Sequence, residues 1–109
     1  MVRGILEIMP TSPLPATVEE TGTDEQLAPL YKVLIHNDDI TPFDFVIRVL
    51  REIFKLGFVR AFAITLEAHN RGVALVVVEP REHAEFHVEQ AHSLARGRNY
   101  PLNFSIEPA

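Results

Sequence analysis

The stretch that decides the fold is Tyr31-Lys32-Val33-Leu34-Ile35-His36-Asn37-Asp38-Asp39-Ile40-Thr41-Pro42-Phe43. Its first half is a short apolar run, which predicts a strand over 30–36 that is buried on both faces and central in a sheet. The Asn-Asp-Asp triplet predicts a turn, because Asn and Asp tolerate unusual backbone angles and bond their own backbone. Thr41 or Asp39 is then expected to cap a helix that has Pro42 in its first position. Three polar side chains therefore lie beside an apolar surface, although a turn and a cap alone would also explain them.

The length, composition and net charge of the chain exclude several classes of function. Its 109 residues suit one small domain, or one domain with a tail, and an apolar fraction of 47% is enough for a core. The net charge of −5 argues against nucleic-acid binding, since phosphate neutralisation needs a basic face. The lack of cysteine excludes disulfides and thiolate chemistry. It leaves the compartment open, with the cytoplasm, or equivalently the plastid stroma, as the expected default. Because no apolar run approaches about 18 residues, and the start is a poor signal peptide, we expect no membrane association.

The composition of residues 1–29 predicts a flexible N-terminal extension, which precedes a domain at 30–109. Prolines are spread through this segment among Thr, Ser and Gly, and no periodic apolar pattern runs long enough to form an element. The apolar side chains near the start of the extension are Val2, Ile5, Leu6 and Ile8. They could dock on a partner or on the domain itself, or belong to a frayed terminus.

Apolar periodicity predicts five further elements in the order helix, helix, strand, helix, strand, over 41–56, 59–70, 73–78, 81–96 and 102–106. In the second helix, Phe62 and Leu66 are expected to face the core. The strand over 73–78 is expected to be buried on both faces. Each helix is expected to end at a glycine cap, at Gly57, Gly72 and Gly97. The order β-α-α-β-α-β predicts an α+β domain, with three helices on one side of a three-stranded, mostly antiparallel sheet.

The sequence contains no convincing set of catalytic residues. No serine stands in a nucleophile-elbow context, and no glycine-rich phosphate loop is present. Asp38 and Asp39 are adjacent in a turn, so they point apart and do not suit an acid–base pair. His83 and His87, with Glu82 nearby, could hold a metal, but two histidines on a wet helix face are more often part of a solvated surface. We therefore expect no catalysis, no cofactor and no resident metal.

A binding function fits the polar residues better. The second helix carries Thr65, Ala68 and His69 on one face. The amide oxygen of Asn37, the carboxylate of Asp38 and a neutral imidazole are all acceptors, so together they suit an ammonium group. An apolar wall beside them would accept a bulky side chain on the same carbon, as in the first residue of a peptide. Alternatively, His69 is a satisfied histidine between helices, and the two small residues only permit close helix packing.

Four features combine into a specific pattern: Asn-Asp-Asp-x-Thr-Pro at 37–42, His69 followed by Gly72, Tyr-Pro-Leu at 100–102, and the closing Ile-Glu-Pro-Ala. Over 30–109 this pattern resembles the ClpS adaptor family. The resemblance implies a monomeric, non-catalytic adaptor that binds N-degron substrates, which are recognised by their first residue. It also implies delivery to a Clp-family AAA+ unfoldase of the ClpA or ClpC type, which feeds the ClpP peptidase, with the N-terminal extension engaging the unfoldase pore.

The resemblance implies a role for individual residues. The side chains that would bind the substrate α-amino group are Asn37, Asp38 and His69, with Asp38 acting through water and on the first backbone groups. The turn and the pocket mouth would be shaped by Asp39 and Thr41. The side-chain pocket would be lined by Phe43, Val46, Thr65, Ala68 and Leu102. The contact with the unfoldase would involve Glu82 and His87, where His87 replaces a basic residue of the family.

Three pocket positions depart from the usual family pattern. Phe43 replaces a gatekeeper methionine, Thr65 replaces a second methionine, and Ala68 replaces a valine. A phenylalanine ring adapts its shape less than methionine does, so the resemblance implies a shifted specificity. We predict that Phe or Leu first residues bind best and Trp worst. An alternative function is a protein–protein module without a peptide pocket, because the C-terminal domain of the ribosomal stalk protein has a similar compact fold.

Overall fold

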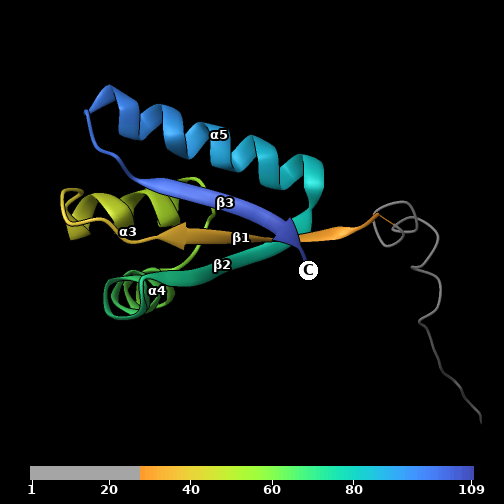
Figure 1. The fold of residues 1–109 in the computed structure, drawn as a ribbon, viewed down its shortest axis with the longest axis horizontal. Helices are drawn as coiled ribbons and strands as arrows, with labels where there is room; N and C mark the ends of the chain where they lie inside the picture. The colour runs from red at the N-terminus through yellow and green to blue at the C-terminus, as the bar shows by residue number, and fades with distance from the viewer. Residues whose placement is uncertain (1–27) are drawn as a thin grey trace, which may run out of the picture.

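The computed structural model describes residues 28–109, and the extension predicted at 1–29 lies almost wholly outside them. Six elements follow in the predicted order: β1 (Leu30–His36), α3 (Phe43–Glu52), α4 (Phe58–Arg71), β2 (Val73–Pro80), α5 (Arg81–Gly97) and β3 (Asn103–Pro108). The strands form one antiparallel sheet in the order β2-β1-β3 (Figure 1). The predicted α+β fold, with β1 at the centre of the sheet, is therefore confirmed.

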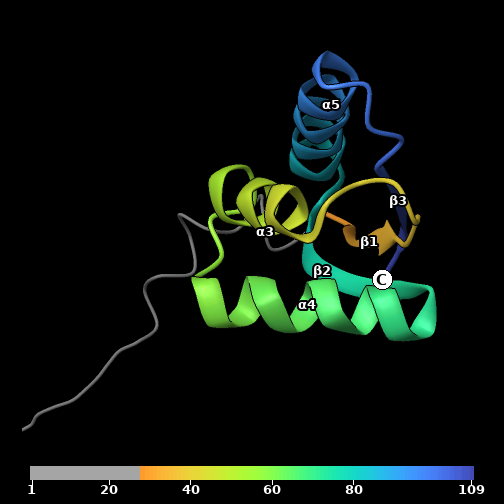
Figure 2. The same cartoon turned by 90° about the vertical axis from the view of Figure 1, so that its left-hand side faces the viewer.

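The helices close the core against one face of the sheet. Helix α5 packs against all three strands, whereas α4 packs against β2 and α3. Seen along the direction of Figure 2, α3 lies between α4 and α5. The largest fully buried side chains come from both layers, and they are Ile35, Leu50, Ile64, Val33, Val49 and Val76.

The strands are not buried on both faces, so that prediction was wrong. Along β2, Ala74 and Val76 are buried, whereas Leu75 is 40% exposed. In β1, Val33 and Ile35 are fully buried and the side chains that alternate with them are only half-buried. Side chains alternate across a strand, and the helices cover one face of this sheet, so the other face meets solvent.

Of the three predicted glycine caps, only Gly72 is confirmed. It has a φ of +92°, which favours glycine, and its N–H donates to a carbonyl of α4. After α3 the chain turns through Lys55 at φ +60°, and after α5 it turns through Asn99 at φ +61°. Gly57 has a φ of −72° and flanks the start of α4. The other two turns are thus made by side-chain-bearing residues, which a search for glycine cannot find.

The predicted core face of α4 was also wrong. Phe62 and Leu66 are 42% and 40% exposed. The buried residues of this helix are Ala61, Ile64, Thr65 and Ala68. These side chains are mostly small, so α4 can approach α3 and β2 closely, and the larger side chains stay outside. The consequence for the site is that Thr65 and Ala68, rather than aromatic rings, face the end of β1.

Candidate binding pocket

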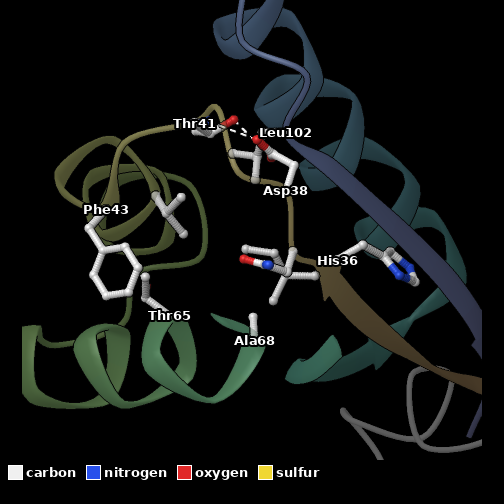
Figure 3. Close-up of a pocket in the computed structure, with 10 residues that line it drawn as sticks. His36, Asp38, Thr41, Phe43, Thr65, Ala68 and Leu102 are labelled. Atoms are coloured by element: carbon white, nitrogen blue, oxygen red, sulfur yellow. Dashed lines mark hydrogen bonds between the residues drawn. The ribbon is translucent and has the colours of Figure 1, made fainter. Parts of the chain in front are cut away.

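The end of β1, the start of α3, the last turns of α4 and the link before β3 surround one hollow (Figure 3). Its empty space, counted out to the open mouth, is about 300 Å³. The lining residues are Ile35, His36, Asn37, Asp38, Thr41, Phe43, Val46, Thr65, Ala68 and Leu102. In Figure 3, Phe43 and Thr65 lie on one side, and Asp38 and Leu102 lie on the other. All five residues predicted as a side-chain pocket therefore border the same hollow.

A backbone hydrogen bond joins the two segments that carry the predicted amine-binding residues. The N–H of Asn37 donates to the carbonyl of Gly72 at 3.0 Å, directly after the last pair of the β1–β2 register, His36 with Val73. Gly72 is the C-terminal cap of α4, so Asn37 lies beside the end of the helix that carries His69. The side chain of Asn37 is exposed and available to a ligand.

Asp38 organises the turn between β1 and α3. Its Oδ1 accepts hydrogen bonds from the backbone N–H groups of Ile40 at 2.8 Å and Thr41 at 2.7 Å. Its Oδ2 accepts one from the Thr41 hydroxyl at 2.9 Å, as the dashed lines in Figure 3 show. Pro42 flanks the start of α3 and provides no side-chain cap. The predicted cap by Thr41 or Asp39 is therefore wrong. The carbonyl of Pro42 accepts the N–H groups of Phe45 and Val46, and the Asp38 carboxylate binds N–H groups of the turn before the helix. Asp39 is exposed and does not line the hollow.

His69 borders the hollow without lining it. Its imidazole meets the ring of Phe43 nearly edge to face, with centroids 5.3 Å apart and an interplanar angle of 79°. Phe43 is itself a lining residue and is 38% exposed. Within residues 28–109, His69 is exposed and makes no side-chain hydrogen bond, unlike a histidine satisfied between helices. The imidazole thus stands at the rim, next to a wall of the pocket.

The remaining walls are apolar, with one polar exception. Val46, Ala68 and Leu102 are 8%, 4% and 5% exposed. Thr65 is 3% exposed, and its hydroxyl donates to the carbonyl of Ala61 at 2.8 Å. Because its one hydrogen is used within the helix, this hydroxyl can act toward a ligand only as an acceptor.

The residues predicted to contact an unfoldase lie on α5, which contributes nothing to the lining of the hollow. Glu82 is exposed. The Nδ1 atom of His87 lies 2.8 Å from Oε2 of Glu79, so this imidazole is tied to the end of β2. In the described part of the chain, no three His, Cys, Asp or Glu side chains gather as a metal site would require. Among the same residues, no helix is both long enough and apolar enough to cross a bilayer.

Sequence reasoning missed two lining residues, Ile35 and His36, because both belong to a strand assigned to the core. The imidazole of His36 turns away from the hollow toward β3, where its Nε2 lies 2.7 Å from the Ser105 hydroxyl (Figure 3). Side chains alternate along a strand, so one of the last two residues before the Asn-Asp-Asp turn had to face the site. That alternation was the available signal.

The fold and the hollow together define a small α+β domain with a pocket at the end of its central strand. The chain belongs to the ClpS family, since the family model described as "ATP-dependent Clp protease adaptor protein ClpS" matches residues 26–105. The predicted resemblance is thereby confirmed. By their description, these proteins are adaptors for the Clp protease rather than proteases.

Individual relatives agree with this assignment. The chain is 44% identical over 97 residues to the ClpS adapter of Roseobacter denitrificans, covering 89% of this chain and 82% of that protein. It is 43% identical over 79 residues to ClpS 2 of Mesorhizobium japonicum, covering 72% and 78%. A solved structure, Agrobacterium tumefaciens ClpS2 bound to L-phenylalaninamide, is 38% identical with a TM-score of 0.72, covering 74% of this chain and 98% of that one.

Proposed function

We propose that this chain binds N-degron substrates through their free α-amino group and bulky hydrophobic first side chain, and delivers them to a Clp AAA+ unfoldase. The observation that carries the proposal is the composition of the hollow. Asn37 and Asp38 supply acceptors at its edge, while Phe43, Val46 and Leu102 supply apolar walls. A polar rim around an apolar hole matches an ammonium group with a hydrophobic side chain on the same carbon.

The ammonium group is bound by three acceptors of different kinds. The amide oxygen of Asn37 and a neutral nitrogen of His69 accept hydrogen bonds from it. Asp38 contributes through its remaining capacity, because Oδ1 already accepts two backbone N–H groups and Oδ2 accepts only one hydroxyl. The free lone pair of Oδ2 can bind a bridging water, and the negative charge of the carboxylate favours a cation nearby.

The first side chain fills the space between Phe43 and Leu102, against Ala68. The ring of Phe43 rests on His69, so this wall has less freedom to adapt than a methionine would. One methylene of misfit is worth about 1–3 kcal/mol, so the preference is graded, with Phe and Leu best and Trp worst. L-Phenylalaninamide, found in the related Agrobacterium ClpS2 structure, combines a free amine with an aromatic side chain and supports Phe as a ligand.

The unfoldase, of the ClpA or ClpC type, binds at Glu82 and His87, and residues 1–29 reach its pore. The position of these two side chains on α5, outside the lining of the hollow, supports simultaneous binding of substrate and unfoldase. Glu82→Lys should therefore weaken binding of the unfoldase and leave peptide affinity unchanged. Pull-down of the unfoldase together with peptide titration of the same variant tests both halves.

The deciding experiment measures fluorescence anisotropy of labelled peptides that begin with Leu, with the amino end free or acetylated. Acetylation should abolish binding, because the ammonium group is lost. Asn37→Ala should weaken binding of the free peptide by about 1–3 kcal/mol, since it removes a hydrogen bond to a charged donor. Asn70→Ala is the matched control, because Asn70 is an exposed amide on α4 outside the lining. Equal binding of free and acetylated peptides would instead favour a protein–protein module that ignores peptide termini.

A second test of the amine site removes the imidazole. His69→Ala loses one acceptor for the ammonium group, so affinity should fall for every first residue in the same titrations. Unchanged affinity in His69→Ala would remove His69 from the site.

A further inference from the structure

His92, on α5, holds the start of β3. Among residues 28–109, strand β3 pairs only with β1, so alternate N–H groups on its other edge have no strand partner there. The Nε2 atom of His92 accepts a hydrogen bond from one of these groups, the N–H of Phe104, at 2.9 Å. The two rings also lie 6.0 Å apart, and Phe104 is only 3% exposed. One imidazole thus joins the helix to the edge strand.

Together with the pairing of Asn103 and Phe104 with β1, this bond fixes one end of the short link between α5 and β3. The other end is fixed by Tyr100, whose N–H donates to the carbonyl of Ala95 at 2.9 Å and whose ring meets Phe45 edge to face at 4.9 Å. Leu102 lies between these anchors, outside helix and strand, and it lines the hollow. The position of this wall therefore depends on both anchors.

We propose that His92 is a positioning residue for substrate selection: by holding Phe104 it keeps Leu102 in place, and so it sets which first side chains fit. This inference rests on the proposed function, because it concerns a wall of the same pocket. It assigns His92 a part in specificity without any contact with the substrate.

The link depends on the protonation of His92. Only a neutral imidazole can accept the N–H of Phe104, because both nitrogens of the charged ring carry hydrogens. Burial lowers the pKa of His92; Glu89 opposes this effect and Arg96 adds to it. The neutral form therefore persists at neutral pH and is lost only in acid.

Titratable groups on the elements packed against α5 are engaged elsewhere. On β1, Tyr31 lies under the guanidinium of Arg81, 5.4 Å from its ring centroid. On β2, Glu79 is bound to His87. Both contacts involve α5 residues that precede His92, whereas β3 presents the apolar Phe104. His36 of β1 also binds β3, through the Ser105 hydroxyl, so the loss of the acid shift in His92→Gln is the result that assigns that shift to His92.

The test compares His92→Gln and His92→Phe with His83→Gln, a control on an exposed histidine of the same helix. Gln keeps an acceptor that does not titrate, whereas Phe keeps a ring without an acceptor. Affinities are measured for labelled peptides that begin with Leu, Phe or Trp, at about pH 7.5 and about pH 5.5. Selectivity is the ratio of affinities within one protein at one pH.

We expect His92→Phe to change the selectivity about threefold or more at neutral pH, and acid to shift the wild type in the same direction. His92→Gln should keep the neutral wild-type selectivity at both pH values, and His83→Gln should behave as the wild type. Every peptide carries the same α-amino group, so a weaker contact at the rim of the hollow lowers all affinities together and leaves the ratios unchanged.

An unchanged ratio in His92→Phe overturns the inference, and so does an acid shift that persists in His92→Gln. If His92→Phe does not fold, the acid shift in the wild type and its loss in His92→Gln carry the test. If the wild type binds no peptide with a free amine, the proposed function fails and the inference fails with it. If the wild type binds and only the ratios stay constant, the proposed function stands without this role for His92.

Discussion

Asp38→Ala should destabilise the folded protein by about 2 kcal/mol. The carboxylate accepts three hydrogen bonds, from the N–H groups of Ile40 and Thr41 and from the Thr41 hydroxyl. The bond to Ile40 is exposed and adds little, because water can replace it. The two bonds to Thr41 are partly buried and contribute about 1 kcal/mol each. Among residues 28–109 no second side-chain acceptor is bonded to these groups, so none compensates for the loss.

Urea unfolding followed by circular dichroism measures this difference. Asp39→Ala is the matched control, because Asp39 is an exposed neighbouring carboxylate without a side-chain hydrogen bond among residues 28–109. Its free energy of unfolding should stay within about 0.5 kcal/mol of the wild type. Asp38→Asn keeps one acceptor oxygen and should fall between the two. Equal stability of Asp38→Ala and Asp39→Ala would refute the claim that Asp38 holds the turn.

Three further predictions concern stability and selectivity. Gly72→Ala should cost about 1–2 kcal/mol in thermal unfolding because of its φ of +92°, whereas Gly57→Ala, at φ −72° with open space around the new Cβ, should cost much less. Thr65→Val should leave the order of first-residue preference unchanged in peptide titrations, because its hydroxyl donates within α4; a new order would mean that the hydroxyl contacts substrate. Burial lowers the pKa of His92 in the folded protein. The neutral ring therefore contributes its full share to the free energy of unfolding above about pH 6.5, the pKa in the unfolded chain, and this share is lost as the pH falls through the lower folded pKa. The wild type should therefore lose stability relative to His92→Gln on acidification, as measured by urea midpoints.

Local signals were sufficient for much of the fold. The apolar run before the Asn-Asp-Asp triplet identified β1, because hydrophobic content and turn chemistry act within a few residues. Its central position was predicted from burial on both faces, which β1 does not have. Gly72 was identified as a helix cap for the same reason, since its φ of +92° is a local backbone conformation that favours glycine. The motif residues also came from one short stretch, and Asn37, Asp38 and Thr41 do border the hollow.

Other features depend on which surface each element meets. The apolar pattern of α4 could not show that Phe62 stays outside, because that choice is made by the close approach of α3 and β2. Similarly, the burial of Leu75 depends on whether a helix covers that face of the sheet, and none does in the described part. The role of Asp38 as the acceptor for the turn was missed because Thr41 and Asp39 have equally suitable side chains, and only backbone geometry distinguishes them.

The sequence by itself determined the order of the elements and the polar turn after the first strand, since each of these follows from residues that are neighbours along the chain. Only the tertiary structure decided that Ala68, Phe43 and Leu102 share one hollow, and that His92 anchors the link that carries Leu102. These residues are far apart in sequence, and packing between helices and sheet, rather than any local preference, brings them together.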